Sequence, residues 1–145
     1  MYKETYRYVL TDSGFWIALY DAEDGQHRDA LKLREEMNNP KIKILIPWPI
    51  MYEVLRGGFI KDARRIQAFE RDIKNLKAEL EDDTAHRLSA LEETFSYASK
   101  WRVSLVDRII WEMLAKLRIY SLITFNERDF SDICKRRKIP INYFE

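Results

Sequence analysis

The chain has 145 residues, a length that suits one domain, and its 46% hydrophobic content is enough to fill a core. The 25 Lys and Arg nearly balance the 24 Asp and Glu, so a formal charge of +1 excludes a global field that attracts nucleic acid. A single cysteine, Cys134, excludes an internal disulfide and a multi-cysteine zinc site, as is typical of a reducing compartment.

The sequence shows no sign of a signal peptide or a membrane span. Its first residues include Lys3, Glu4 and Arg7, where a signal peptide needs an apolar core. The most apolar interior run, 44–52, is broken by two prolines and is far too short to cross a bilayer. We therefore expect a single domain over residues 1–145 that is soluble, cytoplasmic and independent of membranes.

The stretch from Tyr8 to Tyr20 has the pattern of a strand, an acid, a tight turn and a helix. Strand-forming residues 8–11 lead to Asp12, then to Ser13 and Gly14, and then to an apolar run that favours a helix. In an open α/β sheet, ligand-binding groups gather beyond the carboxyl ends of the strands, so Asp12 is a candidate site residue. Taken alone, Asp12 is better explained as the N-cap of the helix.

A second strand follows through a helix. Residues 26–39 have helical spacing, and Ile42 to Ile46 is a short run rich in β-branched residues, which predicts a buried strand parallel to the first. The next helix begins at the prolines after this strand and ends at Gly57 and Gly58. We expect Met51, Val54 and Leu55 to face inward there, which leaves Glu53 roughly opposite, where a solvated glutamate is also reasonable.

Two long helices are then expected, over Phe59 to Leu80 and over Ala85 to Lys100. The first carries a narrow apolar seam, which could pack within the domain or against a second copy. Together the helices should form a hairpin. The residues expected to face inward are Ile66, Phe69, Ile73, Leu76 and Leu80 in the first helix, and Leu88, Leu91, Phe95 and Ala98 in the second.

The last third of the chain repeats the alternation of helix and strand. A helix begins near Ser104, and Asp107 three residues later fits a capping box as well as a site. Residues 121–125 predict a third buried strand, which Asn126 and Asp129 follow directly. A short basic helix over 130–138 and a final strand over 141–144 complete the expected order.

Four acids therefore converge on one edge of the expected sheet: Asp12, Glu53, Asp107 and Asp129. Like charges in a cleft repel and raise one another's pKa unless a cation neutralises them. Oxygen ligands without Cys or His at metal spacing favour Mg²⁺ or Mn²⁺ over zinc. The sequence thus predicts a metal site at this edge.

The residues that carry these acids resemble the PIN-domain ribonucleases, particularly the small VapC-type toxins of toxin–antitoxin pairs. The matching segments, in chain order, are LTDSGFWIALYD, IPWPIMYEVLRGG, SLVDRIIWEMLAK and LITFNERDF. The sequence departs from the usual pattern at Ser13 and Gly14, where Thr-Asn is commoner, and in its long helical pair over 59–100. The resemblance implies a three-layer α/β/α fold with a mostly parallel central sheet, to which the helical hairpin is added.

Carried over residue by residue, the resemblance implies that Asp12, Glu53, Asp107 and Asp129 are the catalytic and metal-binding acids, supported by Thr124 and Asn126. It further implies hydrolysis of RNA phosphodiester bonds with Mg²⁺ or Mn²⁺ and an antitoxin protein as partner. A homodimer is expected separately, from the apolar seam of the first long helix. Which acid performs which task stays open.

Candidate RNA contacts are basic residues near the acids, each of which is more simply explained as a solvated side chain: Arg56, Arg64, Arg65, Arg108 and Arg128. Trp48 and Tyr52 could stack on unpaired bases, although core packing is the simpler role for Trp48. Two other functions stay open, namely a non-catalytic PIN-like binding or assembly module and a PIN nuclease of RNA maturation or phage defence.

Overall fold

The computed structural model describes residues 5–96, 98 and 102–144. Four strands form one sheet: β1 (Arg7–Thr11), β2 (Ile42–Pro47), β3 (Glu79–Glu81) and β4 (Ser121–Ile123). Their order is β3-β2-β1-β4 and every pair is parallel, with Val9 aligned to Ile44 on one side and to Ser121 on the other. The predicted α/β fold with a mostly parallel sheet is confirmed.

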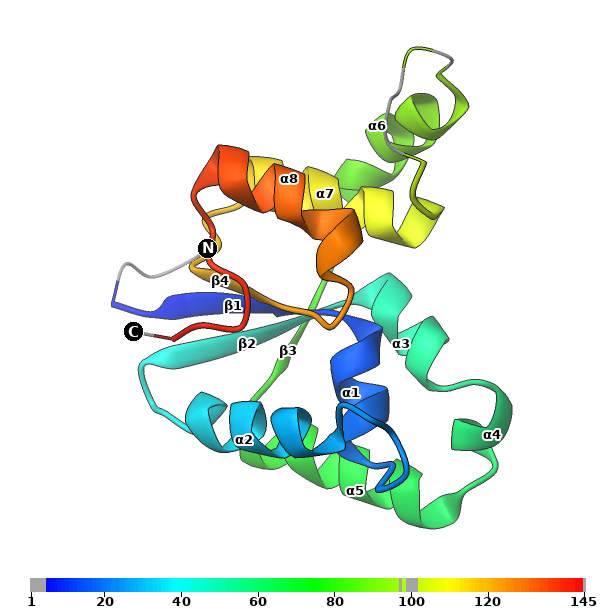
Figure 1. The fold of residues 1–145 in the computed structure, drawn as a ribbon, viewed down its shortest axis with the longest axis vertical. Coiled ribbons are helices and arrows are strands. Elements are labelled where there is room, and N and C mark those ends of the chain that lie inside the picture. The colour runs from blue at the N-terminus through cyan, green and yellow to red at the C-terminus, as the bar shows by residue number, and fades with distance from the viewer. Residues whose placement is uncertain (1–4, 97, 99–101, 145) are drawn as a thin grey trace.

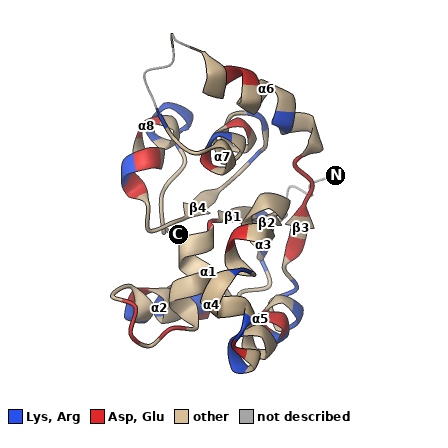
Figure 2. Cartoon of the chain, turned by 90° about the vertical axis from the view of Figure 1, so that its right-hand side faces the viewer, with Lys and Arg blue, Asp and Glu red and all other residues tan. Residues whose placement is uncertain are grey.

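Helices cover both faces of the sheet, which makes three layers (Figure 1 and, turned by 90°, Figure 2). One layer contains α1 (Ser13–Leu19), α2 (His27–Met37) and α5 (Ala63–Asn75), and the other contains α6 (Thr84–Phe95), α7 (Leu105–Lys116) and α8 (Glu127–Arg137). The short helices α3 (Trp48–Val54) and α4 (Gly57–Ile60) continue from the carboxyl end of β2.

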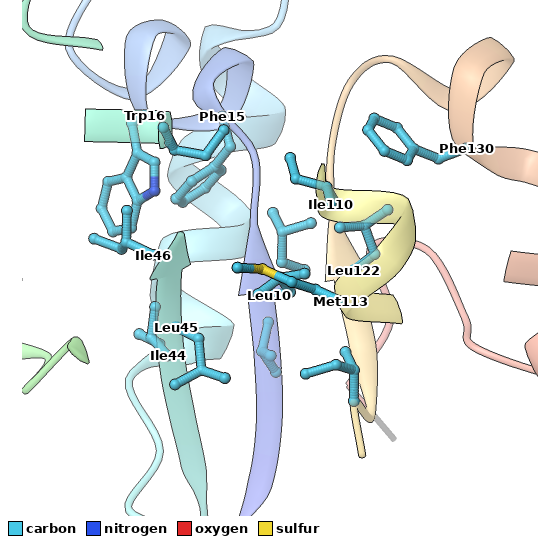
Figure 3. Close-up of a cluster of buried hydrophobic side chains, with 14 of the residues drawn as sticks. Leu10, Phe15, Trp16, Ile44, Leu45, Ile46, Ile110, Met113, Leu122 and Phe130 are labelled. Atoms are coloured by element: carbon cyan, nitrogen blue, oxygen red, sulfur yellow. The ribbon is translucent and has the colours of Figure 1, made fainter. Parts of the chain in front are cut away.

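The core fills the space on both sides of β1 and β2, whose residues are almost all buried, as in central strands covered by helices. Figure 3 shows Phe15 and Trp16 on the side of α1, and Ile110, Met113 and Phe130 on the side of α7 and α8. No described helix combines the length and the apolar character that a membrane span requires.

The prediction of one long helix over 59–80 is wrong, because the chain forms α4, α5 and then the edge strand β3. The helix α5 ends where Lys77 adopts a left-handed conformation with φ of 53°. The amide of Lys77 donates to the carbonyl of Lys74, and the amide of Ala78 donates to that of Ile73, in the pattern of a Schellman motif. Apart from Leu80, which is exposed on β3, the predicted seam packs against the domain's own core.

The expected hairpin is also wrong. The strand β3 lies between α5 and α6 in the chain, and α6 packs against α7 instead. The helix α6 ends at Phe95, and it buries His86 and Ala90, whereas Leu88 and Phe95 are 68% and 75% exposed. The buried face of α6 is thus the one that carries His86 and Ala90, and Leu88 and Phe95 point away from it. Ala98, also expected to face inward, is exposed, and Lys100 lies outside the described residues.

The C-terminal segment shows a smaller difference. Instead of a strand over 141–144, the described residues form one parallel bridge between Leu122 and Ile141. Asn142 then adopts a left-handed conformation with φ of 56°, which stops the extended pairing. This bend brings the Asn142 side chain back to the end of β4.

Candidate functional site

Asp12 lies directly after β1, and it is both an N-cap and part of a buried hydrogen-bond network. Its Oδ1 accepts a 2.8 Å hydrogen bond from the amide of Ser13, as the capping interpretation predicts. Its Oδ2 accepts a second bond of 2.8 Å from the hydroxyl of Thr124, which follows β4. The Asp12 carboxylate is therefore held by donors that lie just after two parallel strands, and Asp12 is only 5% exposed.

Thr124 is itself fixed from three directions. Its hydroxyl accepts a 3.0 Å bond from the amide of Asn126, and its amide and carbonyl bond to the side chain of Asn142. Because the hydroxyl accepts from Asn126, its proton points toward Asp12. The C-terminal bend at Asn142 thus contributes to the orientation of the first acid.

Asn126 connects two further acids. Its Nδ2 lies 2.9 Å from Oδ2 of Asp129, in the first turn of α8, and 3.5 Å from Oδ2 of Asp107, in the first turn of α7. The backbone of Asp107 is capped by Ser104, whose hydroxyl oxygen accepts from the Asp107 amide at 3.1 Å. A single amide group therefore faces the carboxylates that α7 and α8 carry.

Glu53 approaches from α3, which begins at the end of β2. It is half-buried and its side chain is hydrogen-bonded to that of Ser13, next to Asp12. The expected inward stripe is shifted, because Ile50 and Val54 are fully buried while Met51 and Leu55 are only partly covered. Glu53 consequently faces the sheet edge instead of open solvent.

The four acids form one electrostatic cluster. Burial, followed by the charges of Asp12, Glu53 and Asp129, raises the pKa of Asp107 to about 7. Burial also raises the pKa of Asp12, against the lowering effect of the bonds from Thr124 and Ser13. Burial and the nearby Asp12 raise the pKa of Glu53, while the Ser13 bond lowers it. The charges of the other three acids thus all disfavour the charged form of Asp107.

The donor set fits a hard divalent cation by its chemistry. Carboxylate oxygens are the ligands that Mg²⁺ and Mn²⁺ prefer, and a cation would offset both the burial and the repulsion that raise these pKa values. Within residues 5–96, 98 and 102–144, no three or more Asp, Glu, His or Cys side chains already have the spacing of a ligand set. The described side chains therefore supply suitable donors that a bound ion would have to draw together.

The candidate RNA contacts lie in different surroundings. Arg56 is exposed near Glu53, and Arg128 is 94% exposed with its Nε 3.6 Å from Asp129. Arg64 is exposed, whereas Arg65 pairs with Asp21 and Asp62. Arg108 is only 5% exposed and its guanidinium lies 4.8 Å from the ring centre of Trp111, so it is unsuited to a surface contact with RNA.

Two aromatic residues differ from expectation as well. Trp48 is 42% exposed and its ring lies 6.4 Å from that of Tyr52, which is also exposed, so Trp48 is not simply a core residue. Trp111 was not predicted as part of the site, yet its indole N–H donates to the carbonyl of Asp129 at 2.8 Å. Only its spacing of four residues from Asp107 could have indicated this.

Comparison with known proteins identifies the family. A model of the PIN domain matches residues 9–136, most of the chain. The chain belongs to the PIN-domain family. Among solved structures, this PIN domain is similar to VapC20 of Mycobacterium tuberculosis, a toxin that cleaves the sarcin–ricin loop. The TM-score is 0.67 and the identity 23%, over 86% of this chain and 93% of that one.

A second similar structure is that of VapBC2 of Rickettsia felis, which was crystallised bound to a DNA fragment from its promoter. The TM-score is 0.57 and the identity 14%, over 95% of this chain and 99% of that one. A comparison with curated proteins gives no match. At these identities the solved structures establish the fold, and the resemblance to VapC-type PIN domains is confirmed at that level.

Proposed function

We propose that this PIN domain is a metal-dependent endoribonuclease and the toxin of a toxin–antitoxin pair. The observation that carries the proposal is the coupling of Asp12, Glu53, Asp107 and Asp129, which three strands and four helices bring to one edge of the sheet. Buried carboxylates that raise one another's pKa cost folding free energy, and they are typical of functional sites. The membership of the PIN family and the structural likeness to VapC toxins support the same function.

Asp12, Asp107 and Asp129, with Glu53, would hold Mg²⁺ or Mn²⁺. When bound, such an ion lowers the pKa of water and stabilises charge on a phosphate that undergoes hydrolysis. Thr124 and Ser13 keep the Asp12 carboxylate in one orientation, as residues that orient a metal ligand from outside do. Asn126 does the same for Asp107 and Asp129.

Burial raises the pKa of Asp107 and of Glu53, so each is a better base than an ordinary carboxylate for the proton of the attacking water. We assign this role to Glu53, which lies on α3, away from Asn126 and the two acids that its side chain faces. Ser13 orients it by a hydrogen bond. Arg56 and Arg128 are exposed beside this cluster, where they can contact the RNA phosphates.

The test is cleavage of a single-stranded RNA with Mn²⁺ or Mg²⁺. Asp12→Asn should abolish cleavage while the far-UV circular dichroism and melting temperature stay close to wild type. Asp29→Asn, on the exposed face of α2, is the matched control and should cleave normally. Cleavage retained in Asp12→Asn would overturn the proposal, and absent Mn²⁺ binding by the wild type would favour a non-catalytic module.

We also propose that the regulatory partner is an antitoxin protein that covers exposed apolar side chains of α6. Leu88, Leu91 and Phe95 lie on this helix at spacings of three and four residues and are exposed. Figure 1 shows α6 at the margin of the molecule, farther from the sheet than α7. Exposed apolar stripes of this kind mark protein contacts. A short antitoxin reading frame beside the gene is expected, and its absence would favour RNA maturation or phage defence.

Size-exclusion chromatography with light scattering tests the oligomeric state. We expect a homodimer of the isolated chain and a larger complex when the antitoxin is co-expressed. A monomer at micromolar concentration would contradict the homodimer.

A further inference from the structure

Trp111 joins the two helices that carry Asp107 and Asp129. It lies one turn after Asp107 on α7 and is 6% exposed. Its Nε1 donates a 2.8 Å hydrogen bond to the backbone carbonyl of Asp129, in the first turn of α8. One side chain thus connects the helix of one acid to the backbone of the other.

Charged groups from both helices surround the same indole. The guanidinium of Arg108, on α7, lies 4.8 Å from the ring centre, and that of Arg136, on α8, lies 5.9 Å from it. Arg136 is held in turn by Asp132 at 2.9 Å. Cation–π contacts from two helices restrict the rotation of the ring, which keeps the N–H aimed at its acceptor.

The position of this bond matters for the carboxylates. Asn126 donates to Asp129 at 2.9 Å but reaches Asp107 only at 3.5 Å, so its bridge between the two acids is weak on one side. The bond from Trp111 is the shorter connection between α7 and the first turn of α8. Without it, α8 could shift along α7 and carry Asp129 away from Asp107.

We propose that Trp111 is a positioning residue that sets the separation of Asp107 and Asp129 for a divalent cation. This inference rests on the proposed metal site. The indole acts through the backbone of Asp129 and touches neither the cation nor RNA. Residues that orient metal ligands from outside typically change metal affinity by about 10- to 100-fold when they are replaced.

Two variants separate the N–H group from the bulk of the ring. Trp111→Phe removes the donor and part of the ring. Benzothienylalanine, inserted at position 111 through an amber codon, keeps the shape of the indole but replaces its N–H by sulfur. A structural role of the ring alone predicts a defect only for Trp111→Phe, whereas the proposal predicts the same defect for both.

The measurements are Mn²⁺ affinity by calorimetry and steady-state kinetics with RNA. We expect both variants to bind Mn²⁺ about tenfold more weakly and to lose kcat at saturating RNA with little change in KM. Tyr20→Phe is the control, because it removes a 2.7 Å hydrogen bond to Asp72 at the opposite end of α1 from Asp12. Its Mn²⁺ affinity should equal that of wild type.

Each outcome is informative. Mn²⁺ affinity within twofold of wild type in the benzothienylalanine protein overturns the role of Trp111 and leaves the nuclease intact. Weakened Mn²⁺ binding in a protein that never cleaves RNA supports the role of Trp111 and overturns the nuclease. A wild type that binds no Mn²⁺ overturns both.

Discussion

The hydroxyl of Thr124 donates a 2.8 Å hydrogen bond to Oδ2 of Asp12, although the two residues are 112 positions apart in the chain. They meet because β4 and β1 are parallel neighbours, so both strands end at the same edge of the sheet. The bond lowers the pKa of Asp12 against the effect of burial. It is therefore a sensitive place to test the site.

Replacement of Thr124 by valine should weaken the site. The variant loses the bond to Asp12 and leaves the amide of Asn126 without its acceptor, which should cost about 1–3 kcal/mol in the free energy of unfolding. The pKa of Asp12 should rise, and Mn²⁺ affinity at neutral pH should fall. Urea unfolding and calorimetry measure the two effects. Thr124→Ser keeps the hydroxyl and should restore both, and equal behaviour of the two variants would contradict this account.

The stability of the metal-free protein should fall as the pH rises. The folded pKa of Asp107 is raised to about 7 from an ordinary 3.8, so the folded state binds this proton more tightly than the unfolded chain does. The resulting stabilisation is complete below about pH 4 and is lost as the pH rises through about 7. Because Asp107 is half-exposed, solvent screening leaves an expected loss of only about 1–2 kcal/mol.

Urea unfolding in EDTA at pH 5 and at pH 8 checks this dependence. Asp107→Asn removes the titrating group and should reduce the difference between the two pH values. The raised pKa would be contradicted if the difference in free energy of unfolding between wild type and Asp107→Asn were the same at pH 5 and at pH 8.

Divalent metal should reverse the loss at alkaline pH. A cation that binds only the folded protein stabilises it by about 2.7 kcal/mol at a concentration 100 times its Kd. Mn²⁺ should therefore raise the melting temperature of wild type at pH 8 and that of Asp12→Asn far less. Na⁺ at matched ionic strength controls for screening, and an equal rise in Asp12→Asn would place the bound metal elsewhere.

Asp72 on α5 lies away from the four site acids and should affect stability alone. It accepts bonds from Tyr20 at 2.7 Å and from two nitrogens of Arg34, which fastens α5 to the other helices of its layer. Asp72→Ala leaves both partners unsatisfied and should destabilise by about 2–3 kcal/mol. Cleavage per folded molecule should stay at the wild-type level below the melting transition. A loss of activity without a loss of stability would contradict the separation.

The exposed side chains of α6 should matter for the partner and not for the chemistry. Leu88→Lys and Phe95→Ser should weaken binding of the co-expressed antitoxin by at least tenfold, because each removes apolar area from the contact. Their RNA cleavage should match wild type. Tyr143→Ser, exposed near the C-terminus, is the control and should bind normally. Normal binding by the α6 variants would place the antitoxin on another surface.

The sequence alone determined the alternation of strand and helix and the four acids that follow it. Val9 and Leu10, or Ile44 to Ile46, form continuous apolar runs because buried strands need them, and such local patterns can be read without coordinates. Parallel strands also end at one edge, so the convergence of Asp12 with Thr124 and Asn126 followed from the order of the elements.

Tertiary structure alone decided the rest. The edge strand β3 has only three residues, and two of them are Glu79 and Glu81, so its pairing with β2 leaves almost no pattern in the sequence. The outward direction of Leu88 and the burial of Arg108 depend on how α6 and α7 pack. The bond from Trp111 to Asp129 likewise joins residues 18 positions apart on separate helices. Hydrophobic periodicity reports which residues prefer burial, but which neighbour buries them is settled only when the whole chain packs.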